Sequence, residues 1–374
     1  MTRHFLFALI ALGMAAATAC GQPQNRTGQD NNADDGTARD IGEMLLVGFR
    51  GTGIDSTSHI WRDITHYHVG SVILFDYDAI LHQRGRNISG KAQVGRLCSQ
   101  LKALDPDLLI GIDQEGGMVS RLHPRYGFPR IASAHQSAQG GADSVKRCAK
   151  TTAKMLHSAG INLNFAPVAD VDINPQCPVI GKLGRSFSSQ ADEVAACCRL
   201  WIEAQQQHGV ASCLKHFPGH GSASGDTHKG LVDVSSTWQR TELAPYRQLA
   251  SEVPMVMTAH VINRQLDPSG LPASLSPAIT AYLRDSIGFE GVIVTDDLAM
   301  GAIVKEYSYE EAIRMAIAAG ADMLCLSNNG DTYDSELVPI TVGIIRQLLD
   351  EGVVTAERIH QSAERIRKMK SRLH

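Results

Sequence analysis

The stretch from residue 215 to residue 228 holds the densest group of side chains that could do chemistry. Its sequence, KHFPGHGSASGDTH, contains three histidines, one lysine and one aspartate. Asp226 and His228 lie two positions apart, a spacing that in a turn lets the carboxylate accept a hydrogen bond from the imidazole. Such a contact fixes the tautomer of the imidazole and raises its basicity. The pair can therefore donate and recover a proton near neutral pH.

The same histidines allow a second interpretation as a metal site. His216, His220 and His228 carry ring nitrogens that bind metals, but their spacing matches no standard zinc pattern. Lys215 stands beside them, and its positive charge would repel a cation. We therefore expect no metal ion and no cofactor. A purely structural histidine cluster remains the other alternative at this point.

Two adjacent carboxylates, Asp296 and Asp297, follow an apolar run in the segment VTDDLAM (294–300). A carboxylate that faces a proton donor is the arrangement of a retaining glycosidase. One group attacks the anomeric carbon while the other protonates the leaving oxygen. The spacing alone also fits an aldolase or a metal-dependent barrel hydrolase.

Charged residues near other apolar runs are candidates for ligand binding. Asp113 and Arg121 could contact hydroxyl or carbonyl groups, with a mutual salt bridge as the alternative. Arg185 lies in the segment GRSF (184–187) with no nearby helical carboxylate partner. A ligand-binding role and a structural role both stay open for Arg185.

Eight short apolar runs must position these residues. The runs are continuous rather than alternating, which is typical of parallel strands buried on both faces, and helical patterns separate them. Eight such units predict an α/β fold, a (β/α)8 barrel, whose active site lies at the carboxyl ends of the strands. An open doubly wound sheet is the alternative, but no GxGxxG follows the first run. The expected strands are 45–49, 71–75, 108–113, 163–168, 211–217, 255–261, 292–295 and 323–327.

Composition and net charge limit the classes of protein to which the chain can belong. The chain has 374 residues, of which 43% are hydrophobic and 20% charged, with a formal net charge of −4. These values exclude a disordered, collagen-like or polytopic membrane protein. No long basic run occurs, so a nucleic-acid partner is not supported. The oligomeric state stays open.

The N-terminus is expected to be a targeting signal. Arg3 precedes an apolar run over residues 5–19, which is shorter than the roughly 20 residues that a membrane-spanning helix needs. Small residues at 17–19 lead directly to Cys20, as before a cleavage site. The pattern resembles a bacterial lipoprotein signal, in which Cys20 becomes the lipidated first residue. A plain signal peptide is the alternative.

These segments divide the chain into three parts. Residues 1–19 are the expected signal peptide, and residues 20–40 are an expected flexible tether with no apolar periodicity. Residues 41–374 form the expected catalytic domain. The protein is then exported and anchored on the periplasmic or cell-surface side of a membrane. Most of the eight cysteines are expected to be buried and unreactive thiols.

Eight ordered motifs resemble glycoside hydrolase family 3, specifically its β-N-acetylhexosaminidase branch. The likeness covers nearly all of residues 41–370, and the combination of KHFPGHG with DTH is its most specific part. The motifs are IDQEGGMVSRL, NFAPVADVD, GRSF, KHFPGHG, GDTH, MTAHV, VTDDLAM and AGADML.

The resemblance implies a role for individual residues. Asp296 matches the family's nucleophile, and Asp297 is then its neighbour. His228 matches the acid/base, with Asp226 as the residue that orients it. The family fold is a (β/α)8 barrel, in agreement with the eight apolar runs. The positions that match the substrate-binding residues are Asp113, Arg121, Arg185, Lys215 and His216.

The implied activity is that of a retaining, exo-acting β-N-acetylhexosaminidase on peptidoglycan or chitin-type fragments. A phosphorylase is one alternative, because a histidine acid/base adds no negative charge that would repel phosphate. A β-glucosidase of the same family is another, although that branch normally adds a C-terminal domain that supplies a glutamate acid/base. A non-catalytic cell-wall-binding lipoprotein is the alternative from a different class.

Overall fold

A computed structural model describes residues 30–373 of the chain. The expected signal peptide, Cys20 and the first part of the expected tether lie outside the described residues. No helix among the described residues is long and apolar enough to cross a bilayer.

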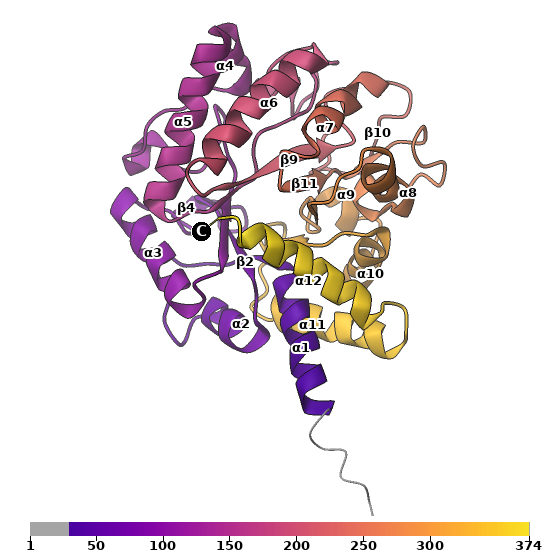
Figure 1. Ribbon diagram of the computed structural model, residues 1–374. Helices are drawn as coiled ribbons and strands as arrows, with labels where there is room; N and C mark the ends of the chain where they lie inside the picture. The colour runs from indigo at the N-terminus through magenta and orange to yellow at the C-terminus, as the bar shows by residue number, and fades with distance from the viewer. Residues whose placement is uncertain (1–29, 374) are drawn as a thin grey trace, which may run out of the picture.

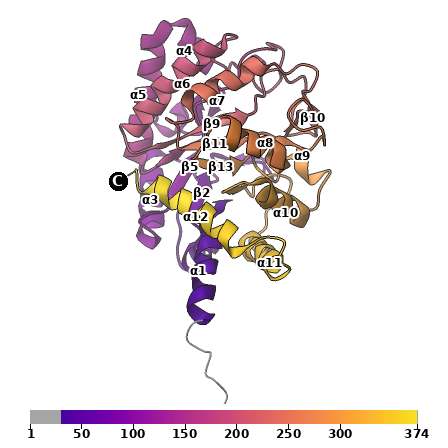
Figure 2. The ribbon, with the colours of Figure 1, turned by 45° about the vertical axis from the view of Figure 1, so that its right-hand side comes forward.

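Eight parallel strands form a closed barrel at the centre of the molecule (Figures 1 and 2). Their order is β13-β11-β9-β8-β5-β2-β1-β14, so each strand lies beside its neighbour in sequence. A parallel bridge between Val294 and Met323 joins the two ends of this order. The predicted (β/α)8 barrel is confirmed. The strands are β1 (Leu45–Gly48), β2 (Ser71–Leu74), β5 (Leu109–Ile112), β8 (Leu163–Asn164), β9 (Ala211–Phe217), β11 (Met255–Thr258), β13 (Val292–Thr295) and β14 (Leu324–Leu326).

Burial explains why these strands appear in the sequence as continuous apolar runs. Every residue of the eight strands is buried. One face of each strand packs inside the barrel and the other packs under the helices, so neither face needs polar residues. Polar side chains are therefore concentrated where the strands end.

Helices surround the barrel and return the chain to the start of each next strand (Figures 1 and 2). α10 shows how sequence sets the bounds: Ser308 and Glu311 form a capping box at its start. Gly320 ends α10 with a φ of 105°, a left-handed conformation that favours glycine. The helices that follow β1 are α2 (His59–Tyr67), α3 (Lys91–Leu104), α4 (Ala134–Gln139), α5 (Gly141–Ala159), α6 (Ala191–Gln206), α7 (Ala244–Leu249), α8 (Pro277–Ala281), α9 (Gly301–Val304), α10 (Tyr309–Ala319), α11 (Leu337–Asp350) and α12 (Ala356–Lys370).

The first described element corrects the expected flexible tether. Residues 30–40 belong to helix α1 (Asp30–Glu43), which packs against α12. Asp40 forms ion pairs with Arg367 and, at 2.8 Å, with His360 of α12, and Ile41 is fully buried. α1 is held by contacts with α12, which lies more than 300 residues later in the chain. Its own sequence is rich in Asp, Asn and Gly and has no periodic apolar pattern, so the helix was not predicted.

Short hairpins stand after the strands at the carboxyl-terminal end of the barrel. β3 (Tyr77–Asp78) pairs with β4 (Gln83–Arg84) after β2, and β6 (Gln114–Gly116) pairs with β7 (Val119–Ser120) after β5. A parallel pair, β10 (Val232–Asp233) with β12 (Val261–Ile262), completes this end.

The cysteines agree with the expectation from composition. The seven cysteines of the described part are unpaired, and five of them are buried, as expected.

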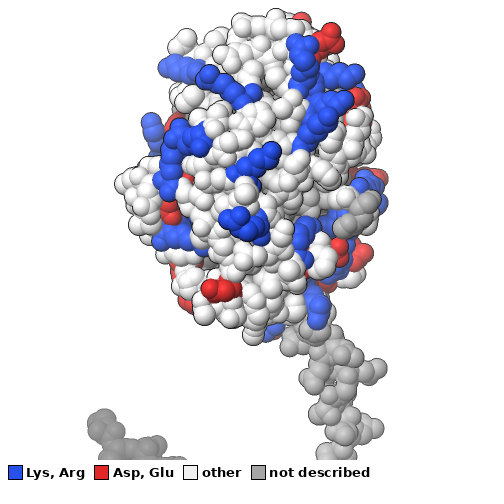
Figure 3. Space-filling view, turned by 90° about the vertical axis from the view of Figure 1, so that its left-hand side faces the viewer, with Lys and Arg blue, Asp and Glu red and all other residues white. Residues whose placement is uncertain are grey.

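Figure 3 shows a face on which Lys and Arg outnumber Asp and Glu, although the net charge is −4. Composition alone does not reveal how charge is distributed over the surface.

Candidate active site

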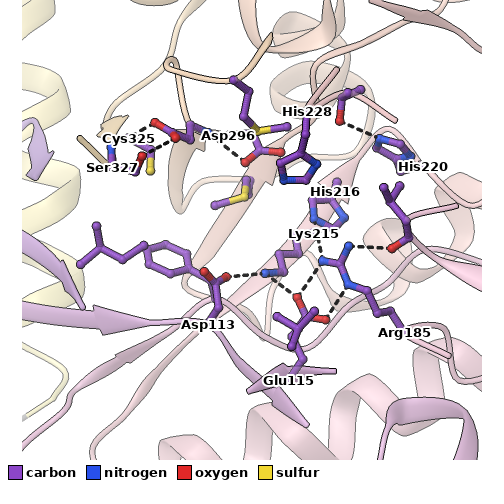
Figure 4. A pocket seen from close by; sticks show the side chains of 18 of the residues that line it. Asp113, Glu115, Arg185, Lys215, His216, His220, His228, Asp296, Cys325 and Ser327 are labelled. Atoms are coloured by element: carbon purple, nitrogen blue, oxygen red, sulfur yellow. Dashed lines mark hydrogen bonds and ion pairs between the residues drawn. The ribbon is translucent and has the colours of Figure 1, made fainter. Parts of the chain in front are cut away.

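A cavity opens where the barrel strands end, and the candidate residues converge on it (Figure 4). Asp226 lies behind His228, to which it is hydrogen-bonded. The structure therefore brings together the eight residues that the family resemblance assigned to catalysis or substrate binding. The seven that line the cavity are Asp113, Arg121, Arg185, Lys215, His216, His228 and Asp296.

Asp296 comes directly after β13 and presents its carboxylate to the cavity. Its backbone N–H donates to the carbonyl oxygen of Thr258 at 2.9 Å, which fixes the strand end. Its Oδ1 accepts the N–H of Asp297 at 2.8 Å. Withdrawal from bulk water opposes ionisation, but the facing imidazoles of His260 and His216 and this N–H outweigh it and lower the pKa of Asp296. Asp296 is therefore an ionised carboxylate at neutral pH.

Asp297 has a different environment from its neighbour. Its carboxylate accepts hydrogen bonds from the hydroxyl and the N–H of Ser327 and from the N–H of Ala299. Burial raises the pKa of Asp297 in spite of these donors. Neighbouring carboxylates whose pKa values are pushed apart serve different roles. Asp297 is engaged with the strand-end loops, which leaves Asp296 as the carboxylate available to a ligand.

His228 lies on the loop between β9 and β10 and faces Asp296. Its Nδ1 is 2.8 Å from Oδ1 of Asp226, which also accepts the backbone N–H of His228 at 3.0 Å. Desolvation opposes ionisation of Asp226, yet the hydrogen bonds from His228 lower its pKa. The ionised carboxylate occupies Nδ1 and leaves Nε2 free for a ligand. Figure 4 shows the imidazole of His228 beside the carboxylate of Asp296.

A cluster of opposite charges forms the adjoining wall of the cavity. Lys215 at the end of β9 lies 2.8 Å from Oδ1 of Asp113 and 2.7 Å from Oε1 of Glu115. Arg185 donates two hydrogen bonds to Glu115, at 2.8 and 2.7 Å. Arg121 completes the cluster at 3.4 Å from Asp113. Such an array offers fixed donors and acceptors for sugar hydroxyl and carbonyl groups.

One expectation about this cluster needs correction. No helical carboxylate lies near Arg185 in the sequence, but Glu115, seventy residues earlier, pairs with it through both oxygens. Lys215 does not keep Asp296 ionised, because its ammonium group pairs with Asp113 and Glu115. The imidazoles around Asp296 serve that purpose.

Asp170 is a site residue whose function the sequence did not reveal. It is fully buried, and its Oδ2 lies 2.6 Å from Nδ1 of His216. Its Oδ1 accepts the backbone N–H of His220 at 2.7 Å. One carboxylate thus orients the cavity-lining His216 and holds the turn that begins the His228 loop. Among residues 30–373 no group of three His, Cys, Asp or Glu side chains is arranged to hold a metal ion.

Replacing Glu115 by glutamine should destabilise the fold. Burial opposes its ionisation, but Arg185 and Lys215 lower the pKa of Glu115 to about 2. Its stabilising effect is therefore present above its ordinary pKa, about 4.3, and is lost as the pH falls towards 2. We expect a cost of about 3–5 kcal/mol in the free energy of unfolding at neutral pH, because two buried cations lose a partner.

Urea unfolding at about pH 7 and about pH 3 measures this cost. The difference in the free energy of unfolding between wild type and Glu115→Gln should become smaller at the lower pH. Glu203→Gln, which removes an exposed carboxylate from α6, is the matched control and should change little. If Glu115→Gln is as stable as wild type at about pH 7, or if its loss of stability is equally large at about pH 3, the electrostatic account of this cluster is contradicted.

The sequence matches a known protein family over most of its length. The model of the Glycosyl hydrolase family 3 N terminal domain matches residues 37–369. The chain belongs to glycosyl hydrolase family 3. It is 34% identical over 291 residues to a protein named beta-hexosaminidase from Pseudomonas aeruginosa (strain LESB58), an alignment that covers 76% of this chain and 82% of that protein.

Solved structures of the family share the fold. A glycoside hydrolase family 3 beta-N-acetylglucosaminidase from Paenibacillus sp. str. FPU-7 has a TM-score of 0.80 at 35% identity, covering 90% of this chain and 62% of that longer chain. Beta-N-acetylhexosaminidase from Beutenbergia cavernae DSM 12333 has a TM-score of 0.78 at 27% identity, covering 90% of this chain and 98% of that one. The family resemblance is confirmed, and the chain is a glycoside hydrolase.

Proposed function

We propose that this family 3 enzyme removes terminal β-linked N-acetylglucosamine from peptidoglycan or chitin-type fragments, with retention at the anomeric carbon. The observation that carries the proposal is that an ionised Asp296 and the Asp226–His228 pair share one cavity. The names of the Pseudomonas and Paenibacillus proteins support the choice of sugar.

In the first step, Asp296 attacks the anomeric carbon. A bond forms between its carboxylate oxygen and that carbon, and the glycosidic bond to the leaving oxygen breaks. His228, protonated on both nitrogens, gives its Nε2 proton to the leaving oxygen and keeps its Nδ1 proton, which it donates in a hydrogen bond to Asp226. The carboxylate of Asp226 stabilises the imidazolium before this transfer.

In the second step, the neutral imidazole acts as a base. Nε2 of His228 accepts a proton from water, and the oxygen of that water attacks the anomeric carbon. The bond to Asp296 breaks and its carboxylate is restored. Two inversions at the same carbon give net retention. The charged cluster around Lys215 and Arg185 holds the sugar during both steps.

Hydrolysis of a panel of nitrophenyl β-glycosides tests the proposed sugar specificity. We expect kcat/KM for the N-acetylglucosaminide to exceed that for the glucoside and the xyloside by at least about 100-fold, because a site that hydrogen-bonds an amide discriminates strongly against analogues without it. A preference for the glucoside would contradict the proposal.

The molecule that receives the sugar in the second step, water or phosphate, needs a separate test. The wall of the cavity beside Asp296 carries Lys215, Arg185 and Arg121, and the acid/base is a histidine, so phosphate is a second candidate acceptor. Product analysis with and without phosphate decides between them. Free N-acetylglucosamine as the main product supports hydrolysis, whereas sugar 1-phosphate would identify a phosphorylase.

We further propose that the protein is exported and anchored to a membrane through a lipid on Cys20. The apolar run that ends in small residues directly before Cys20 supports this proposal. In a bacterial host, the wild-type protein should fractionate with membranes and Cys20→Ser should not be acylated. Equal fatty-acid labelling of both proteins would contradict the proposal.

A further inference from the structure

The loop that carries His228 must be held in place by something other than its own catalytic pair. Asp226 and His228 both lie on this loop, so their hydrogen bond orients the imidazole but does not tie it to the barrel. The side chain of His228 is 65% exposed. Its position opposite Asp296 therefore depends on contacts made by its neighbours in the loop.

Thr227, between the two catalytic residues, makes a side-chain contact that leads back to the barrel. It is 3% exposed, and its Oγ1 lies 3.2 Å from Nε2 of His220. Its carbonyl oxygen also accepts the N–H of Ala302 in α9 at 3.0 Å. The contact with α9 involves only the main chain of Thr227, whereas the contact with His220 depends on its side chain.

His220 is itself fixed to the barrel. Only 2% of its surface is exposed, and its backbone N–H donates to Oδ1 of the fully buried Asp170. The same carboxylate holds His216, which lines the cavity. His220 thus links the buried carboxylate of Asp170 to Thr227 in the catalytic loop.

The chemistry of His220 fits a structural bond rather than proton transfer to a substrate. Burial lowers the pKa of His220 to about 4, so its ring is neutral at neutral pH and carries one proton. Its Nε2 is engaged with Thr227, and its Nδ1 has no hydrogen-bond partner among the described residues. Figure 4 shows the ring of His220 on the far side of His228 from Asp296.

We propose that His220 is a positioning residue, whose hydrogen bond to Thr227 holds the catalytic loop so that His228 faces Asp296. The proposal rests on the assignment of His228 as the acid/base. Without the bond, the loop spends part of its time displaced, and His228 neither protonates the leaving oxygen nor activates water during that time.

Kinetics of Thr227→Val, with Thr227→Ser as its matched control, test the proposal. Valine keeps the volume of threonine but removes the hydroxyl, whereas serine keeps the hydroxyl. We expect Thr227→Val to lower kcat roughly fivefold to tenfold, the effect of losing one hydrogen bond between neutral groups. Thr227→Ser should stay within about twofold of wild type. His220→Ala should lower kcat as Thr227→Val does, and the double variant should be no worse than either single one.

Azide distinguishes a misplaced base from a damaged fold. With an activated aryl N-acetylglucosaminide, azide attacks the glycosyl-enzyme without help from a base, so it should restore turnover of Thr227→Val and His220→Ala. A general loss of folding would not be restored in this way. Thermal unfolding of each variant is measured alongside.

The outcomes separate this inference from the proposed function. Wild-type kcat for Thr227→Val, or a loss that azide does not restore while it does restore His228→Ala, overturns the role of His220. Additive losses in the double variant overturn it as well. If azide fails to restore His228→Ala itself, the assignment of His228 is wrong, and this inference falls with it.

Discussion

Replacing Asp296 by alanine should lower kcat for an aryl β-N-acetylglucosaminide by at least about 10⁴-fold, because removing a nucleophile removes the covalent route itself. Within residues 30–373, the side chain of Asp296 makes one hydrogen bond, from the N–H of Asp297. We therefore expect the free energy of unfolding to change by no more than about 1 kcal/mol. Initial rates and urea unfolding of the same preparation provide both measurements.

Asp296→Asn is the matched control for Asp296→Ala. The amide keeps the shape of the side chain and can still accept the N–H of Asp297, but it does not attack the anomeric carbon. It should be as inactive as alanine and as stable as wild type. Near-normal turnover of either variant would contradict the assignment of Asp296 as the nucleophile, and unfolding of both would show that Asp296 supports the fold.

Replacing His228 by alanine should have an effect that depends on the leaving group. General acid–base catalysis contributes about 10²–10⁴-fold. A disaccharide, whose leaving oxygen needs a proton, should lose rate towards the upper end of this range. A dinitrophenyl glycoside leaves without protonation, so its release should be much less affected and only the second step should be slow.

Lys229→Ala is the control for this change on the same loop. Its side chain is 84% exposed and lies 3.9 Å from Asp226, so a change there tests for disturbance of the loop in general. It should remain within about twofold of wild type. Equal losses of His228→Ala on both classes of substrate would contradict a role in protonating the leaving group.

The barrel was predictable because burial on both faces gives its strands an unmistakable composition. The positions of Asp113, Lys215 and Asp296 were predictable for a related reason, since charged groups at the ends of buried strands need solvent or partners. These ends converge in a barrel, and the structure brings them to one cavity. Family resemblance then supplied a role for each residue.

The partners of these residues were not predictable, because pairing depends on contacts across the chain. Glu115 binds Arg185 across seventy positions, and the hydrogen bonds that Asp170 accepts from the segment at 216–220 span about fifty. One indication of these partners was nonetheless present. Lys215 and Arg185 were both expected at the site, and buried cations require carboxylates nearby. Helix α1 gave no such signal, because its stability comes from α12.

Trapping the covalent intermediate tests the central claim most directly. A fluorinated N-acetylglucosaminide with an activated leaving group slows the second step more than the first, so the glycosyl-enzyme accumulates. After proteolysis, mass spectrometry should find the sugar on the peptide that contains Asp296, and His228→Ala should retain the label longer. A label on any other residue, or an initial product of inverted configuration, would contradict the account.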